Sequence, residues 1–338
     1  FIGAVERVPG SEIDFNRDIR PILSSNCFLC HGPDAADRKA DLRLDTREGA
    51  FGTNNGVQAI DPENLSESEF LYRITSDDED EIMPPPESHM VLSSEQKSLL
   101  KKWILSGAEY KDHWAFSPPS KSQTAPGSDN AGRANNPIDS FIIGHLAKAG
   151  LAQSVEADRR TLIRRVTYDL TGLPPAPSDV ESFVNDESPQ AYEKVVDRLL
   201  SSKRYGERMA LAWMDAARYG DSSVMHADGP RDMWAWRDWV IEAYNSNMPF
   251  DRFTTEQLAG DLLPEATVAQ RVASGFNRNH ATSDEGGAFA EELRVEYVVD
   301  RVKTTANVWM GLTMECAQCH DHKTDPVSQK AVSYTHLT

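Results

Sequence analysis

Two copies of one five-residue pattern constrain this chain of 338 residues more than any other feature. They lie at residues 27–31 (CFLCH) and 316–320 (CAQCH), and together they contain all four cysteines of the chain. The C-x-x-C-H spacing is typical of c-type haem attachment, because two thiols three positions apart reach the two vinyl groups of one haem. The histidine that follows is held beneath the iron as its proximal ligand. We therefore predict two covalently attached haems c, held by Cys27, Cys30, Cys316 and Cys319, with His31 and His320 as iron ligands.

The four cysteines have two alternative interpretations, a zinc site and a redox pair. A Cys₄ zinc ribbon also uses two C-x₂-C pairs, but it leaves the histidine after each pair unexplained. The two pairs also lie almost the whole chain apart. A thioredoxin-like redox pair is the weaker alternative, because neither motif follows a strand pattern or opens a βαβ unit.

The charge and hydropathy of the chain limit the kinds of molecule and membrane that it can bind. The formal net charge is −18, which argues against nucleic acid and anionic membranes and permits docking of a basic redox partner protein. No apolar run approaches the length of a membrane span. Covalent haem attachment takes place outside the cytoplasm, so we expect a periplasmic or extracellular protein whose export signal preceded Phe1.

The first hundred residues have the parts of a small haem domain. Apolar residues at helical spacing over 14–23 precede the first motif, and we expect this helix to be short or to end at Pro21. Further helices are predicted at 67–75 and from Ser93 or Ser94 to Gly107, where Gln96 stands in capping-box spacing to Ser93.

A methionine followed by three prolines, at residues 83–86, is the candidate distal ligand of the first haem. A thioether sulfur is a soft iron ligand that raises the reduction potential, and the prolines fix an extended backbone that presents it. We predict Met83 as this ligand, with Met90 and His89 as substitutes. The alternative is a methionine that packs against the haem edge or in the core.

The N-terminal motifs resemble a known family. The stretches 14–23 (DFNRDIRPIL), 27–34 (CFLCHGPD) and 38–45 (RKADLRLD) are similar to the planctomycete cytochrome C domain, over about residues 11–110. The resemblance implies that these residues form a haem domain, which in that family stands at the N-terminal end of large secreted proteins.

A second domain follows a linker at 111–135 that is rich in Pro, Ser, Gly and Asn. Helical periodicity then dominates over 138–149, 158–170, 178–185, 191–201, 206–219, 233–245, 253–259, 267–276 and 289–314. The stretches 168–175 (YDLTGLPP), 247–251 (NMPFD), 256–264 (EQLAGDLLP) and 316–325 (CAQCHDHKTD) resemble the second domain of the same planctomycete proteins, over about 136–330. The fold class is therefore mostly α: a small cytochrome c-like helical domain linked to a larger, mainly helical one.

The last eight residues, 331–338, differ in character from the rest. From Val332 they read like the translation of a transposase-based sequencing adapter. We therefore expect the natural protein to continue beyond about Lys330, and we exclude His336 from every ligand argument.

The second haem has no obvious distal ligand. His322 is too close in sequence to His320 to reach the opposite face of the same iron. His280 is the best remaining imidazole, followed by His226, although a histidine in a polar loop more often lies on the surface. Met225, Met310 and Met314 are further candidates, although their helical spacing favours core packing. The sixth position of this iron can also be open.

The function that these observations favour is a secreted di-haem c-type cytochrome that moves single electrons. One alternative is a di-haem redox enzyme, peroxidase-like or carbohydrate-oxidising, with a catalytic second domain. Another is a mono-haem cytochrome fused to a domain that binds polysaccharide. The sequence leaves enzymatic activity undecided.

Overall fold

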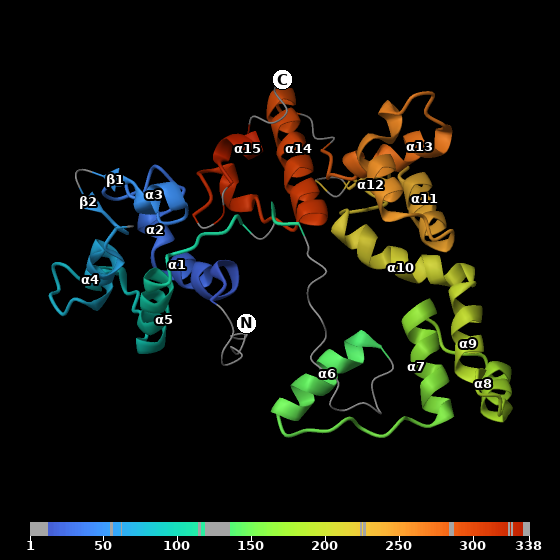
Figure 1. Ribbon diagram of the computed structural model, residues 1–338. Helices are drawn as coiled ribbons and strands as arrows, with labels where there is room; N and C mark the ends of the chain where they lie inside the picture. Colours follow the sequence, from blue (N-terminus) through green and yellow to red (C-terminus); the bar gives the residue numbers. More distant parts are fainter. Residues whose placement is uncertain are drawn as a thin grey trace. The chain divides into compact units, whose positions relative to one another are not determined.

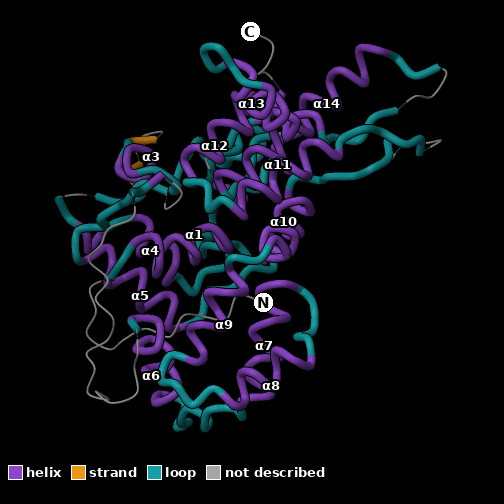
Figure 2. The backbone as a smooth tube through the Cα atoms, turned by 90° about the vertical axis from the view of Figure 1, so that its right-hand side faces the viewer, coloured by secondary structure: helices purple, strands orange, loops and turns teal. Residues whose placement is uncertain are grey.

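The computed structural model describes residues 13–54, 57–61, 63–113, 116–118, 136–223, 225, 228–283, 287–323, 325 and 327–333. Its contacts group the chain into two compact units: unit 1 is Phe1–Ser117 with Val298–Thr338, and unit 2 is Pro118–Tyr297. Helices predominate in the described parts of both, and the strands there form one short hairpin (Figures 1 and 2). The prediction of a mostly α chain is confirmed.

Unit 1 begins with a π-helical turn, Phe15–Ile19, that runs directly into α1, Arg20–Asn26. Asp14 caps the turn by accepting a hydrogen bond from the Arg17 backbone N–H at 2.9 Å. The helix does not end at Pro21, and α1, with 7 residues, is short, as the other half of the expectation has it. Pro21 instead lies in the first turn of α1, where its missing N–H leaves no helical hydrogen bond unmade.

The other elements of the N-terminal segment surround α1. They are α2 (Phe28–His31), α3 (Arg47–Phe51), β1 (Thr53–Asn54), β2 (Val57–Gln58), η2 (Leu65–Glu67), α4 (Glu69–Thr75), η3 (Pro86–Ser88) and α5 (Ser94–Leu105). The strands β1 and β2 pair antiparallel, with Asn54 opposite Val57. The predicted capping box at α5 is confirmed, because Ser93 and Gln96 exchange side-chain and backbone hydrogen bonds.

One apolar core holds this segment together. Its centre is aromatic: the ring of Phe15 lies 5.7 Å from that of Trp103 and 4.6 Å from that of Tyr110. Trp103 also donates its indole N–H to the Glu109 carbonyl at 3.1 Å, so its one polar atom is paired although the side chain is buried. The core therefore joins the first helical turn to the last helix of the segment.

The C-terminal part of unit 1 consists of the end of α14 (Ala290–Thr305), the π-helical turn η7 (Ala306–Met310), the 3₁₀ turn η8 (Glu315–Gln318) and α15 (Gln329–Ser333). The helix predicted over 289–314 ends earlier, because Gly311 adopts a left-handed conformation with φ of 64°. A separate small core, with Leu312, Ala317, Val327 and Val332 buried in it, lies around η8.

Unit 2 contains a succession of helices close to those that we predicted. They are α6 (Pro137–Lys148), α7 (Arg159–Thr171), α8 (Pro177–Asn185), α9 (Ala191–Leu200), α10 (Lys203–Ala216), α11 (Trp234–Asn245), α12 (Phe250–Ala259), η5 (Gly260–Leu262), α13 (Val268–Ala273) and η6 (Ser274–Arg278). The apolar faces of α7, α8 and α9 meet in one core around Ile163, Phe183 and Val195 (Figure 1). The helices α10 and α11 approach closely at Gly206, whose backbone N–H donates to the Asn245 side chain at 2.8 Å.

Some predicted features fall outside the described residues. They include most of the linker at 111–135, His226, and residues 334–338 of the adapter-like tail. The domain boundaries at 110 and 136 stay predictions, and the contacts group Val298–Thr338 with the N-terminal segment rather than with unit 2. None of the helices in the described ranges combines the length and apolar character needed to cross a bilayer.

Candidate functional site

The first C-x-x-C-H motif folds as one tight helical turn. The Cys27 backbone N–H ends α1 by donating to the Leu23 carbonyl at 2.7 Å. The backbone N–H groups of Cys30 and His31 both donate to the Cys27 carbonyl, at 3.1 and 2.8 Å. Residues three and four positions apart share one face of a helix, so this turn brings Cys27, Cys30 and His31 to one side. Phe28, which is fully buried in the core, anchors the turn.

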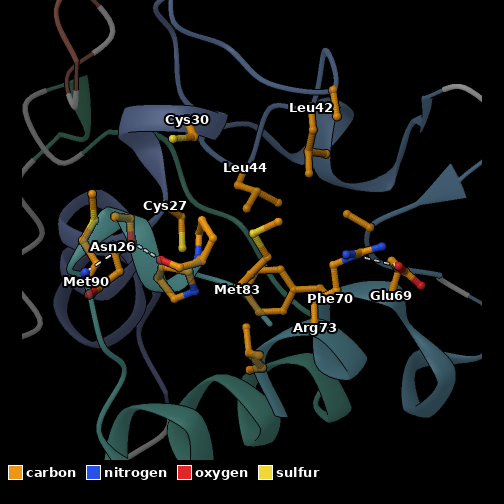
Figure 3. Close-up of a pocket in the computed structure, with 16 residues that line it drawn as sticks. Asn26, Cys27, Cys30, Leu42, Leu44, Glu69, Phe70, Arg73, Met83 and Met90 are labelled. Carbon is orange, nitrogen blue, oxygen red and sulfur yellow. Dashed lines mark hydrogen bonds and ion pairs between the residues drawn. The ribbon is translucent and has the colours of Figure 1, made fainter. Parts of the chain in front are cut away.

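Beside this turn lies a cavity of about 390 Å³ with mostly apolar walls. Such a volume lies within the range of small-molecule and cofactor sites. Figure 3 shows Cys27, Met83, Leu44 and Phe70 around this space. The lining residues are Asn26, Cys27, Cys30, Ala40, Leu42, Leu44, Ala59, Glu69, Phe70, Arg73, Ile74, Met83, Pro84, Pro85, Ser88 and Met90.

The predicted ligand Met83 lies in this cavity together with the two thiols. Its backbone N–H donates to the Arg73 carbonyl at 2.9 Å, which ties the loop after α4 to that helix. Pro84 and Pro85 form part of the wall next to it. Of the two substitutes, Met90 also lines the cavity, whereas His89 is exposed and does not. The structure therefore brings Met83 to the first motif, and ligation of the iron by Met83 stays a prediction.

His31 is partly buried next to the thiols but does not line the cavity. Its Nδ1 is buried and has no hydrogen-bond partner among the described residues. Burial lowers the pKa of His31, against the opposing effect of a backbone hydrogen bond at Lys39. The neutral imidazole that results is the form that binds a metal. A buried nitrogen without a partner and an apolar cavity beside two thiols fit a covalently held haem.

Burial also raises the pKa of the Cys27 thiol to about 12, and the neighbouring Cys30 adds to this effect. The four cysteines do not converge on one point. Within the described residues, no group of three or more His, Cys, Asp or Glu side chains is placed to hold a metal ion. The zinc-ribbon alternative therefore has no four-thiol site in the described part of the chain.

The lining of the cavity includes an ion pair that sequence reasoning missed. Arg73 and Glu69 form an ion pair at 2.7 Å, and a guanidinium N–H of Arg73 also donates to the Glu81 carbonyl at 3.3 Å. Their i, i+4 spacing on α4 was the available signal. The pair fixes the edge of α4 that faces the Met83 loop.

The second C-x-x-C-H motif has a different local structure. Its first three residues belong to the 3₁₀ turn η8, which ends before Cys319. Ala317 is buried against the small core, whereas Cys316 and Cys319 are exposed. The His320 side chain is 42% exposed, and its Nδ1 lies 2.6 Å from the Asp321 carbonyl oxygen. The two motifs therefore differ in how far their thiols are buried.

The segment after the second motif contacts the residues after the first. Lys323 donates to Asp34 at 2.5 Å and also pairs with Asp37. The His320 Nδ1 lies 3.9 Å from the same Asp34 carboxylate. The Lys323 ammonium lowers the pKa of Asp34, whose side chain is 3% exposed. No signal in the sequence indicates this contact, because the partners lie almost 290 positions apart.

His280, the predicted distal ligand of the second haem, belongs to unit 2, whereas His320 belongs to unit 1. It is buried and stacks on Tyr297, with ring centroids 4.4 Å apart. Its Nδ1 lies 3.0 Å from the Ala281 carbonyl oxygen. The assignment of His280 as a ligand stays a prediction.

Comparison with known families agrees with the resemblance seen in the sequence. Residues 137–336 match the family model PSCyt2, described as a protein of unknown function (DUF1549), and residues 27–87 match the model described as Planctomycete cytochrome C. These two matches confirm the expected order of the two domains. No curated protein and no solved structure matches the chain. The second match identifies residues 27–87 as a cytochrome c-like haem domain, whose cofactor is haem c.

Proposed function

We propose that this chain, which belongs to the PSCyt2 family (protein of unknown function, DUF1549), is a di-haem c-type cytochrome that transfers single electrons. The observation that carries this proposal is the cavity of about 390 Å³ that Cys27, Cys30 and Met83 line together. Two thiols and a thioether around one apolar space are the donor set of a covalently held haem with methionine ligation.

Each residue of the first site has a defined role. Cys27 and Cys30 would anchor the haem through thioether bonds, and the neutral imidazole of His31 would bind its iron. Met83, which lines the same cavity as the two thiols, would supply its thioether sulfur to the iron and raise the reduction potential. The apolar side chains, Leu42, Leu44, Phe70 and Ile74 among them, exclude water from the site. The bound haem supplies an iron that takes up and releases one electron.

The second site is proposed from its motif: Cys316 and Cys319 attach a haem and His320 holds its iron, with His280 as the candidate distal ligand. The exposure of Cys316 and Cys319 favours a second candidate function. In that candidate, only the first motif carries haem, and the cytochrome domain is fused to a domain that binds another molecule, such as a carbohydrate.

Localisation and partners follow from the chemistry. We propose a periplasmic or extracellular protein, because covalent haem attachment takes place outside the cytoplasm. The net charge of −18 supports a basic redox partner protein and disfavours nucleic acid.

The haem-to-protein ratio of the full chain tests the proposal. The chain is expressed in a periplasm that matures c-type cytochromes, and the pyridine haemochrome spectrum of denatured protein gives the number of thioether-linked haems. We expect two haems, one after Cys27→Ser with Cys30→Ser, and one after Cys316→Ser with Cys319→Ser. A ratio of one that only the first pair of substitutions abolishes would support the mono-haem candidate. A colourless product, from cells that mature a control cytochrome, would refute both.

A further inference from the structure

Unit 1 contains a second cavity, of about 440 Å³, whose lining differs from that of the haem cavity. It is rich in basic side chains although the chain as a whole is strongly acidic. The basic residues that line it are Arg20, Arg43, Arg47, Lys111 and His113, and the acidic ones are Asp45, Glu48 and Asp112. We call this space the Arg20 cavity.

Arg20 is the unusual member of this lining. Its side chain belongs to α1 and the residue is only 9% exposed. Its guanidinium lies 5.7 Å from the ring centre of Phe28, yet it makes no hydrogen bond or ion pair with the residues that the structure describes. Arginine is almost never buried to this degree unless it is paired, because removing a charge from water is costly. Burial accordingly lowers the pKa of Arg20.

Two carboxylates, those of Asp45 and Asp325, act electrostatically on Arg20, and each of them contacts other side chains. Asp45 accepts a hydrogen bond from Arg43 at 2.9 Å. Asp325 faces His113, at 3.4 Å from Nε2, and His322, at 3.6 Å from Nδ1. Both carboxylates act on Arg20 electrostatically, but neither lies within ion-pair distance of it. The guanidinium therefore retains free donors that face the cavity.

The rest of the lining suits a small organic or inorganic anion. Arg47 also lines the cavity and is exposed, and its guanidinium lies 4.6 Å from the ring centre of Phe51. The aromatic rings of Tyr110 and of the half-exposed Phe116 form part of the cavity wall. A guanidinium presents its N–H groups as a planar fork that matches two oxygens of a carboxylate or phosphate.

We propose that the Arg20 cavity binds a small oxyanion, through a carboxylate or phosphate group that pairs with Arg20. The bound oxyanion supplies the acceptor oxygens that Arg20 lacks within the fold, and Arg47 adds a second positive charge to the lining. This site is independent of haem attachment, because none of the residues that hold the haem lines it.

Calorimetric titration of the full chain tests the proposal. Succinate and inorganic phosphate are the probes, uncharged succinamide is the control ligand, and sodium chloride keeps the ionic strength constant. We expect saturable binding of at least one anion and none of succinamide, and the anion that binds more tightly identifies the ligand class. The variant Arg20→Gln should weaken binding by about tenfold or more, because it removes a bidentate charged contact.

The variant Arg17→Gln is the matched control. It removes the same charge three residues away, from a side chain that pairs with Asp18 and does not line the cavity, so binding should change less than about twofold. Equal affinity of Arg20→Gln and wild type would overturn the proposal. So would the absence of saturable binding of both anions up to about 10 mM.

A measurement on the wild type alone covers the case in which Arg20→Gln does not fold. With the better-binding anion at saturation, hydrogen exchange should slow in peptides that cover residues 20–31 and 43–48, relative to succinamide. Unchanged exchange in both regions would overturn the proposal in the same way.

Discussion

The contact between Lys323 and Asp34 gives a sharp prediction, because it joins segments that are remote in sequence. The Lys323 ammonium donates to Asp34 at 2.5 Å, and the Asp34 side chain is 3% exposed. Replacing Lys323 by methionine keeps most of the aliphatic stem but removes the ammonium. Asp34 then keeps its bond from the Ala36 backbone N–H, at 3.0 Å, and the His320 Nδ1 at 3.9 Å. We expect the segment around the second motif to detach more often from the N-terminal segment.

The magnitude follows from the two ion pairs that are lost. A hydrogen bond to a buried charged group contributes about 1.5–3 kcal/mol, and an exposed pair such as that with Asp37 adds less than about 1 kcal/mol. A total of about 2–3 kcal/mol corresponds to a rise of about 30- to 140-fold in the opening equilibrium, since about 1.4 kcal/mol is a factor of ten.

Hydrogen exchange of peptides covering residues 315–323 measures this equilibrium when closing is faster than exchange. Lys330→Met is the matched control, because Lys330 is exposed in the same segment. We expect faster exchange in Lys323→Met and an unchanged rate in Lys330→Met. If both variants exchange within about twofold of wild type, the contact does not hold the segment and the reasoning is refuted.

Three further predictions concern stability. Trp103→Ala should destabilise unit 1 by about 3–5 kcal/mol in urea unfolding, because it empties the aromatic core and removes a satisfied indole N–H; a loss below about 1 kcal/mol would contradict this. Gly206→Ala should lower the free energy of unfolding by about 1–3 kcal/mol, since the new Cβ would lie 2.4 Å from the Ile241 carbonyl oxygen. In the control variant Gly229→Ala, no heavy atom lies within 4 Å of the new Cβ, so its stability should be nearly unchanged. Equal losses of stability in the two variants would argue against the close approach of α10 and α11. Hydrogen bonds from Ser188 and Lys194 lower the pKa of Asp186 to about 2, so the stability it contributes is present above its ordinary pKa of about 4 and is lost as the pH falls towards 2. The difference in unfolding midpoint between wild type and Asp186→Asn should therefore shrink over that range, and a constant difference would contradict the assignment.

Local features of the fold were predictable because they depend on neighbours in sequence. The capping box at Ser93 and the helices of unit 2 follow from residues within one or two turns of each other. The turn at Pro21 was misjudged because a proline pattern marks both the start and the end of a helix. The end of the helical run α14–η7 before Gly311 was missed because the apolar periodicity continues beyond this glycine.

The candidate haem site was predictable in its parts and only partly in its arrangement. Covalent chemistry fixes the spacing of Cys27, Cys30 and His31, and the Met83 loop could be inferred from the soft sulfur and the prolines after it. The partner of Asp34 could not be predicted, because a pairing over such a separation leaves no local pattern. The unpaired state of Arg20 depends in the same way on which carboxylates the fold brings near it.

Electron transfer at the first haem, with Met83 as ligand, is the central claim, and a spectroelectrochemical titration tests it most directly. The full chain with Cys316→Ser and Cys319→Ser isolates the first motif. We predict one reversible one-electron transition, whose potential falls in the Met83→Leu variant because the soft sulfur that stabilises reduced iron is lost. The variant Met90→Leu, a second methionine of the same cavity, should keep the wild-type potential. The absence of a reversible transition would contradict the account, and an unchanged potential in Met83→Leu would contradict the assignment of Met83.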